Sequence, residues 1–417
     1  MTNWDGGVSA VVGAGQCSFQ PGNELEERCL SLANINGIFP KRNSCIGYIS
    51  GLAVLTTMFA GFSFIGNSLI GLFFALIVIV LSFEKIKISP LQLISVLLLS
   101  IYCAVVLFFA LDEYIVLQNI RYWFGFTVYV FFFMARPDNR LISFGFVRFL
   151  CVSVLVESLL VNTLVSSELL HSGSNEIGIV FAGWYERPLS FAGNPGTSGI
   201  ALLSLFFLVE RLLKTNATKF DLFLLFVAIA VLVSTTAMIG FIFLLVLRLF
   251  TGSSKISERL SLRNSLLPLV LVVFIGCVYF NVDVEYIQKF SVDYISYIYN
   301  LKFFQISEYS NDGLLDFLIG SQVYDLTPKT SGDFGWLVFL NAMGLFGVAL
   351  YLFSLFSFYR SGKVLFPVLV LMLVGSTHYP SAMSPAGQLI IAMTLTLGPL
   401  YLHEFKTLKS RCSVDLG

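Results

Sequence analysis

The chain has 417 residues, of which 57% are hydrophobic and 12% are charged, and its formal net charge is zero. Soluble domains carry about 25% charged residues. No soluble fold could bury this much apolar surface, so the composition excludes a soluble protein and indicates a bilayer as the solvent. A zero net charge gives no argument for a nucleic-acid partner. The 7 cysteines show no CxxC spacing, which argues against a disulfide framework or a zinc site.

Apolar runs of roughly 17–25 residues, the length that a membrane helix needs, recur along the chain. They predict an all-α polytopic membrane protein with about twelve spans. The runs lie near residues 46–63, 66–83, 90–110, 119–134, 141–166, 196–213, 220–234, 236–250, 265–280, 336–357, 364–377 and 386–402. Several runs are short. Residues 220–250 are interrupted by Ser234–Ala237, which favours two short helices joined by a tight turn over one tilted helix.

Lysine and arginine in the short loops predict the orientation of these spans. With twelve spans, every basic cluster falls on one side, which the positive-inside rule assigns to the cytoplasm. We therefore expect residues 1–45 to be an N-terminal cytoplasmic segment, since they do not resemble a signal peptide. The transmembrane domain covers 46–402, and 403–417 form a cytoplasmic tail. Two larger loops, 167–195 and 281–335, fall on the opposite face.

A polar stretch, "WYERPLSFAGNPGTSG" (Trp184–Gly199), directly precedes the sixth predicted span on that outer face. Arg187 stands where positive-inside bias does not place an arginine, and a guanidinium presents a fork of donors that matches phosphate oxygens. A salt bridge to Glu186 or another loop acid is the alternative. Asn194–Thr197 predict a turn into a helix, whose N-terminal amides favour anions. A plain turn and cap explains the same residues.

Two ionisable residues lie within the fifth predicted span, where such groups are rare and often functional. Arg148 and Glu157 are nine residues apart, which is roughly 13 Å of helical rise. They are therefore not a direct pair, although both could face the interior of the bundle. Arg148 could instead extend to the cytoplasmic surface, and Glu157 could make a structural hydrogen bond.

Further candidates lie in the last two outer loops. Asp333, just before the tenth predicted span, could act as a general base or simply cap the helix. His378 could serve as a base or a phosphate ligand, or as neither. Tyr324 is one of several tyrosines of the large loop that could stack on sugar rings or pack the loop. The chain has no carboxylate cluster such as DxD to hold a metal.

Two motifs together resemble the superfamily of O-antigen polymerases and O-antigen ligases. One is an arginine followed by Gly-Asn-Pro before a span, and the other is "DFGWL…GLFG", which opens a late span after the largest outer loop. The resemblance implies a glycosyltransferase-C-like helical fold in the bacterial inner membrane. Polymerases of this superfamily join repeat units carried on undecaprenyl diphosphate at the periplasmic face. They use no nucleotide sugar and usually work with a chain-length regulator.

The resemblance also implies roles for residues. Arg187 would bind the diphosphate and Asn194 would shape the pocket, while Asp333 and Glu186 would position or deprotonate the acceptor hydroxyl. The large loop has no arginine, so a second cationic anchor is missing or is replaced by a lysine such as Lys329. The predicted catalytic residues are Asp333, Glu186 and His378, and the predicted substrate-binding residues are Arg187, Asn194, Arg148, Glu157, Tyr324 and Lys329.

The activity expected from the resemblance is polymerisation without a cofactor. Ligases usually carry a histidine in the large loop, and this loop has none, which favours a polymerase. Two alternatives remain: an O-antigen ligase, which transfers the glycan to lipid A core, and a flippase or transporter of lipid-linked oligosaccharides. The length of segment 281–335 argues against the flippase, because transporters usually have short loops.

Overall fold

The computed structural model describes twelve stretches of the chain. They are residues 45–62, 68–109, 113–135, 143–171, 180–181, 185–213, 217–251, 292–311, 313–320, 335–359, 365–379 and 381–396. Most of these residues are helical. The helices in the first half are α2 (Cys45–Met58), α3 (Ser68–Leu81), the short 3-10 helix η2 (Phe83–Lys85), α4 (Pro90–Phe109), α5 (Glu113–Ala135), α6 (Phe144–Thr163) and α7 (Ser167–Leu170).

The second half is also mainly helical. Its helices are α8 (Pro195–Leu213), α9 (Lys219–Val231), α10 (Thr235–Thr251), α13 (Val292–Asn311), α14 (Leu314–Ile319), α15 (Gly335–Phe358) and α16 (Phe366–Gly375), followed by Pro385–Thr396. Between α7 and α8 two short strands, β1 (Val180–Phe181) and β2 (Tyr185–Glu186), pair antiparallel. This hairpin departs from the all-α expectation, and it lies in the predicted outer loop.

Every predicted apolar run coincides with a described helix, apart from 265–280, which lies outside the described residues. Length and composition identify two of these helices as able to cross a membrane, Phe144–Thr163 and Pro195–Leu212. The bent pair Gly335–Asn341 and Met343–Phe358 adds a third if it is one span. Several other apolar helices are shorter. The described residues thus indicate a helical membrane protein, whereas twelve spans and two periplasmic loops stay predictions.

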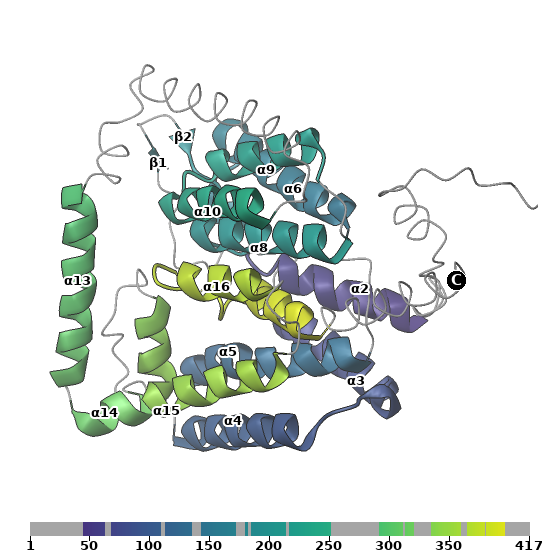
Figure 1. The fold of residues 1–417 in the computed structure, drawn as a ribbon, viewed down its shortest axis with the longest axis vertical. Coiled ribbons are helices and arrows are strands. Elements are labelled where there is room, and N and C mark those ends of the chain that lie inside the picture. The colour runs from purple at the N-terminus through teal and green to yellow at the C-terminus, as the bar shows by residue number, and fades with distance from the viewer. Residues whose placement is uncertain are drawn as a thin grey trace, which may run out of the picture.

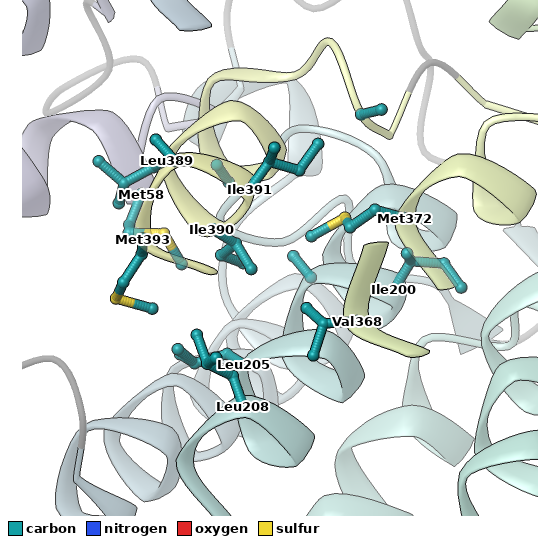
Figure 2. Close-up of a cluster of buried hydrophobic side chains, with 14 of the residues drawn as sticks. Met58, Ile200, Leu205, Leu208, Val368, Met372, Leu389, Ile390, Ile391 and Met393 are labelled. Atoms are coloured by element: carbon teal, nitrogen blue, oxygen red, sulfur yellow. The ribbon is translucent and has the colours of Figure 1, made fainter. Parts of the chain in front are cut away.

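The helices form two groups that pack against each other. Figure 1 shows α6, α8, α9 and α10 on one side and α3, α4, α5 and α15 on the other, with α16 between them. Within the groups, α8 contacts α10, α6 contacts α9, and α4 contacts α15. Helix α13 runs along one edge and contacts α14. Figure 2 shows the apolar cluster beside α8: Met58 of α2, Leu205 and Leu208 of α8, Val368 of α16 and Leu389 of the last helix lie together.

The outward faces of several helices are apolar. Large apolar side chains are exposed along α3, α4 and α6, among them Phe73, Val80, Ile101, Phe108 and Leu159. A contiguous apolar surface of this kind is unfavourable in water, whereas hydrocarbon chains solvate it well. Backbone polar groups are paired within each helix, which is what a lipid environment requires. The distribution of exposed apolar residues therefore agrees with the composition.

Two helix breaks set the geometry of the bundle. Residues 220–250 form two helices, as the sequence predicted. The turn between them contains Val233 at φ 46, and the Ser234 hydroxyl accepts a hydrogen bond from Ala237 N at the start of α10. In α15 the two halves are bent by 112°, and Gly344 has φ 60. A Cβ at Gly344 would overlap the backbone of Leu318 and Ile319 of α14, so this contact requires glycine.

Candidate functional site

The polar stretch before α8 folds into a compact loop that ends in a helix cap. Asn194 Oδ1 accepts a hydrogen bond from Thr197 N at 3.0 Å, and its carbonyl accepts from Ser198 N at 2.9 Å. Asparagine is a favoured N-cap, and Pro195 suits the first helical position, where its missing N–H costs nothing. The structure therefore shows that Asn194 caps α8, and its role in shaping a binding pocket stays a prediction.

The middle of this loop is buried in the protein. Leu189, Ser190 and Phe191 are each at most 1% exposed. Gly193 N donates to Ser190 O at 2.8 Å, and Gly193 has φ 73, a conformation that glycine adopts without strain. Gly61, just after α2, donates its N–H to Phe191 O at 2.8 Å. A Cβ on Gly61 would overlap the backbone of Gly193, so the two segments are packed backbone to backbone.

A buried acid and a buried histidine contact the backbone of this loop and of the segment after α2. Glu157 of α6 and His171, which follows α7, are 2% and 3% exposed. His171 Nε2 lies 2.8 Å from Glu157 Oε1, and the same oxygen accepts the N–H of Ser190 at 2.8 Å. His171 Nδ1 lies 2.6 Å from the carbonyl oxygen of Gly61. Sequence reasoning identified Glu157 but missed His171, whose only signal was a lone histidine in an outer loop.

The hairpin places Glu186 beside the C-terminal end of α6. Asn162 of α6 donates to Glu186 O and accepts from Glu186 N, both at 2.8 Å. The Tyr185 hydroxyl donates to Val231 O at 2.6 Å and lies 3.0 Å from Ser158 Oγ. Burial raises the pKa of Tyr185 above its usual value, so this phenol stays protonated and keeps the hairpin attached to α6 and α9.

Arg187 is half-buried at the start of the loop. Within the described residues it forms no ion pair, and its Nε is buried without a hydrogen-bond partner. The salt bridge to Glu186 that the sequence left open is therefore not formed. An arginine is rarely held in a partly buried position without an anion, so Arg187 is a candidate anion-binding residue of this loop.

The segment after α16, which the sequence predicts to be the last outer loop, meets the loop before α8 at the first turn of that helix. A Cβ on Gly196 would overlap the ring of Tyr379, so Tyr379 lies directly against this turn. The ring of His378 is 4.2 Å from that of Tyr379, measured between centroids. The Ser376 hydroxyl accepts the N–H of Ala382 at 2.8 Å and so closes the turn in which both rings lie. Two segments far apart in the sequence thus meet at the N-terminus of α8.

Arg148 does not join this group. Its Nε lies 2.6 Å from Oδ1 of Asp221 at the start of α9, and its side chain is 45% exposed. Asp221 also accepts from the backbone and side chain of Thr218, and Thr218 in turn caps α9. Glu157 faces the interior as expected, whereas Arg148 lies at the surface of the bundle. The missed partner had a local signal, because Thr218-x-x-Asp221 is a capping-box pattern.

Three predicted site residues, Asp333, Tyr324 and Lys329, lie outside the described residues. The described part of the chain holds no group of three or more His, Cys, Asp or Glu side chains that could bind a metal ion. The structure brings Glu186, Arg187 and Asn194 into one loop above Glu157, with His378 beside the helix that follows.

Comparisons with models of protein families, with curated proteins and with solved structures found no match.

Proposed function

We propose that the chain is a membrane glycosyltransferase of the polymerase type. It joins repeat units of an O-antigen or a related surface polysaccharide, carried on undecaprenyl diphosphate, at the periplasmic face of the bacterial inner membrane. One observation carries this proposal: Arg187 has no anionic partner among the described residues and stands on a loop fixed at the N-terminus of α8. A half-buried guanidinium without an anionic partner suits a diphosphate, because its fork of donors matches phosphate oxygens.

The chemistry needs few groups. The bond between the sugar C1 and the diphosphate oxygen breaks, and the diphosphate leaves with the electron pair. A hydroxyl oxygen of the acceptor unit bonds to C1, and its proton passes to a nearby base. Arg187 binds the charge that grows on the departing diphosphate, and this lowers the barrier because the charge is larger in the transition state. The base that takes the proton is Glu186, next to Arg187, or His378, beside α8. The resemblance to O-antigen polymerases also implies this role for Asp333.

The proposed activity also predicts the membrane topology and the binding partners of the protein. Both termini lie in the cytoplasm, and the loops 167–195 and 281–335 lie in the periplasm. The lipid-linked oligosaccharide is donor and acceptor in turn, no cofactor takes part, and a chain-length regulator is the expected protein partner. The buried polar cluster at Glu157 and the aromatic pair His378–Tyr379 flank the loop that meets the diphosphate.

The test is the length distribution of the glycan on lipopolysaccharide extracted from a deletion strain. The strain is complemented with the unsubstituted chain, with Arg187→Ala, with Arg187→Lys or with Lys219→Ala. Lys219 is an exposed cation at the start of α9 and serves as the matched control. We expect deletion to leave single repeat units on the lipid A core. Arg187→Ala should reduce chain extension by about a hundredfold, the usual effect of removing one donor to a developing anion.

The other outcomes separate the alternatives. If deletion leaves the core bare while long chains persist on undecaprenyl diphosphate, the chain is a ligase. If no periplasmic units accumulate, it is a transporter, and the assignment of Arg187 fails as well. Equal chain lengths with Arg187→Ala and Lys219→Ala, at equal protein levels, would remove Arg187 from donor binding.

A further inference from the structure

The cluster of Glu157, His171 and Ser190 joins four separate segments beneath the loop that carries Arg187. Oε1 of Glu157 in α6 contacts both His171 Nε2 and Ser190 N, and His171 Nδ1 contacts the carbonyl oxygen of Gly61 after α2. Phe62 stacks on the imidazole, with ring centroids 4.8 Å apart. We propose that His171 and Glu157 are positioning residues, which share one proton and thereby fix the Ser190 amide and the loop from Arg187 to Asn194.

The hydrogen-bond partners determine the number of protons in the pair. The carbonyl oxygen of Gly61 only accepts, so His171 Nδ1 must carry a hydrogen. The 2.8 Å contact between Nε2 and Glu157 Oε1 then needs one more proton on either atom, because two lone pairs at that distance repel. A second extra proton would leave the pair with a net positive charge in a buried site. With one shared proton the pair is neutral as a unit.

This arrangement excludes a direct role in chemistry. Both ring nitrogens of His171 are occupied, and neither His171 nor Glu157 is more than 3% exposed, so no substrate atom reaches them. Glu157 Oε2 and Ser190 Oγ are also buried, and neither has a hydrogen-bond partner in the described structure. The cluster therefore acts through the loop above it.

Ser190 shows what the cluster holds in place. It has φ 68, a left-handed conformation that is unfavourable for a residue other than glycine. Such a conformation persists only where the surroundings enforce it. Here the Glu157 carboxyl binds the Ser190 N–H, while Gly61 and Gly193 pack against each other on the other side of the turn. Arg187 lies three residues before Ser190, so its position depends on this turn.

The test uses Glu157→Gln, which keeps the size of the side chain but changes its donors and acceptors. An amide oxygen facing His171 and Ser190 would need an Nε2 hydrogen, which the neutral ring lacks while Nδ1 donates to Gly61. An amide nitrogen would face the Ser190 N–H instead. In the first orientation the repulsion between the two lone pairs displaces the amide oxygen from the Ser190 N–H, and in the second the Ser190 N–H has no acceptor. The Ser190 contact is therefore weakened in either orientation. The double variant Glu157→Gln with His171→Gln restores a donor for the amide oxygen and so restores the Ser190 contact.

The first readout is hydrogen exchange of the Ser190 amide in the full-length protein in lipid nanodiscs. We expect exchange to be about tenfold faster or more in Glu157→Gln, which corresponds to the loss of one buried hydrogen bond. The double variant should return to within about threefold of the unsubstituted protein. Ser95→Ala is the control, because it removes a partly buried hydrogen bond to Ser357, between α4 and α15, and should leave the loop unchanged. Unchanged exchange in Glu157→Gln overturns the proposal.

The second readout is glycan length in the complemented deletion strain, because the link to Arg187 rests on the proposed function. Glu157→Gln should shorten the glycan as Arg187→Ala does, and the double variant should recover length. Suppose that Glu157→Gln speeds exchange at Ser190 and that Arg187→Ala shortens the glycan. If Glu157→Gln nevertheless leaves glycan length unchanged, the positioning role is wrong. If Arg187→Ala itself has no effect, the donor-binding role of Arg187 fails, and the exchange result alone decides whether the cluster fixes the loop.

Discussion

Helix α6 carries one acid–base pair at each end, and the two pairs differ in almost every physical respect. Near its start, Arg148 pairs with Asp221, and the arginine side chain is 45% exposed. Two and a half turns later, Glu157 pairs with His171, and both side chains are at most 2% exposed. The pair of Arg148 and the buried Asp221 joins two helices, whereas the pair of Glu157 and His171 joins a helix, a loop and Gly61 after α2.

The difference in burial between the two pairs predicts which of them stabilises the fold. The Arg148 guanidinium is partly solvated, and the buried Asp221 keeps two hydrogen bonds from Thr218 without it, so the net contribution of this ion pair is small. Where a buried polar group has no such alternative, loss of one partner leaves the other desolvated and unpaired. We therefore expect the stability of the protein and the geometry of its loop to depend on the Glu157 end of α6 and hardly at all on the Arg148 end.

The largest expected effect is that of Glu157→Ala. The substitution removes the acceptor for the Ser190 N–H and the partner of His171 Nε2, and it leaves a cavity in the bundle. Breaking a buried pair of this kind costs about 3–5 kcal/mol. The free energy of unfolding in mixed micelles should fall by that amount. If the free energy of unfolding falls as little as expected for Arg148→Ala, the two pairs of α6 contribute equally to stability, which would contradict this prediction.

Gly61→Ala should be next in size, because the loop lies against the backbone at this position. A Cβ there would overlap Gly193 N and the carbonyl oxygen of Phe191. Overpacking of this kind costs about 1–3 kcal/mol. Gly51→Ala is the matched control, since a Cβ at Gly51 within α2 meets nothing within 4 Å. That control should stabilise the helix by up to about 1 kcal/mol, and a loss at Gly51 equal to that at Gly61 would contradict the steric argument.

Ser190→Gly should have a smaller effect and the opposite sign. Glycine adopts φ 68 without strain, keeps the N–H that Glu157 binds, and removes a buried hydroxyl without a described partner. The greater freedom of glycine in the unfolded chain offsets part of this gain. We expect a stabilisation of up to about 1 kcal/mol, read from the unfolding midpoint. Ser190→Ala removes the hydroxyl but keeps the strain, so it should be less stable than Ser190→Gly.

The sequence predicted the apolar helices well because the apolar runs record them directly. It missed α13 and α14, which lie in the predicted loop 281–335. The break before α10 was also predictable, since Ser234–Ala237 interrupts an apolar run. The buried position of Glu157 agrees with the expectation that an acid inside a predicted span could face the interior of the bundle. The partners did not follow in the same way: Arg148 and Asp221 are 73 residues apart, and Glu157 and His171 are 14 apart across a loop. Side-chain pairing between helices depends on packing, which periodicity does not record.

The smallest expected effect is that of Arg148→Ala. Without the arginine, Asp221 still accepts the backbone N–H of Thr218 at 2.9 Å and its hydroxyl at 2.6 Å, so no buried charge is left without a donor. The unfolding midpoint should therefore shift by no more than the error of the measurement, and added salt should reduce any shift further, since exposed charges are screened. A large, salt-independent loss in Arg148→Ala would show that the exposed pair also fixes the bundle, because then Asp221 would depend on the guanidinium as Ser190 depends on Glu157.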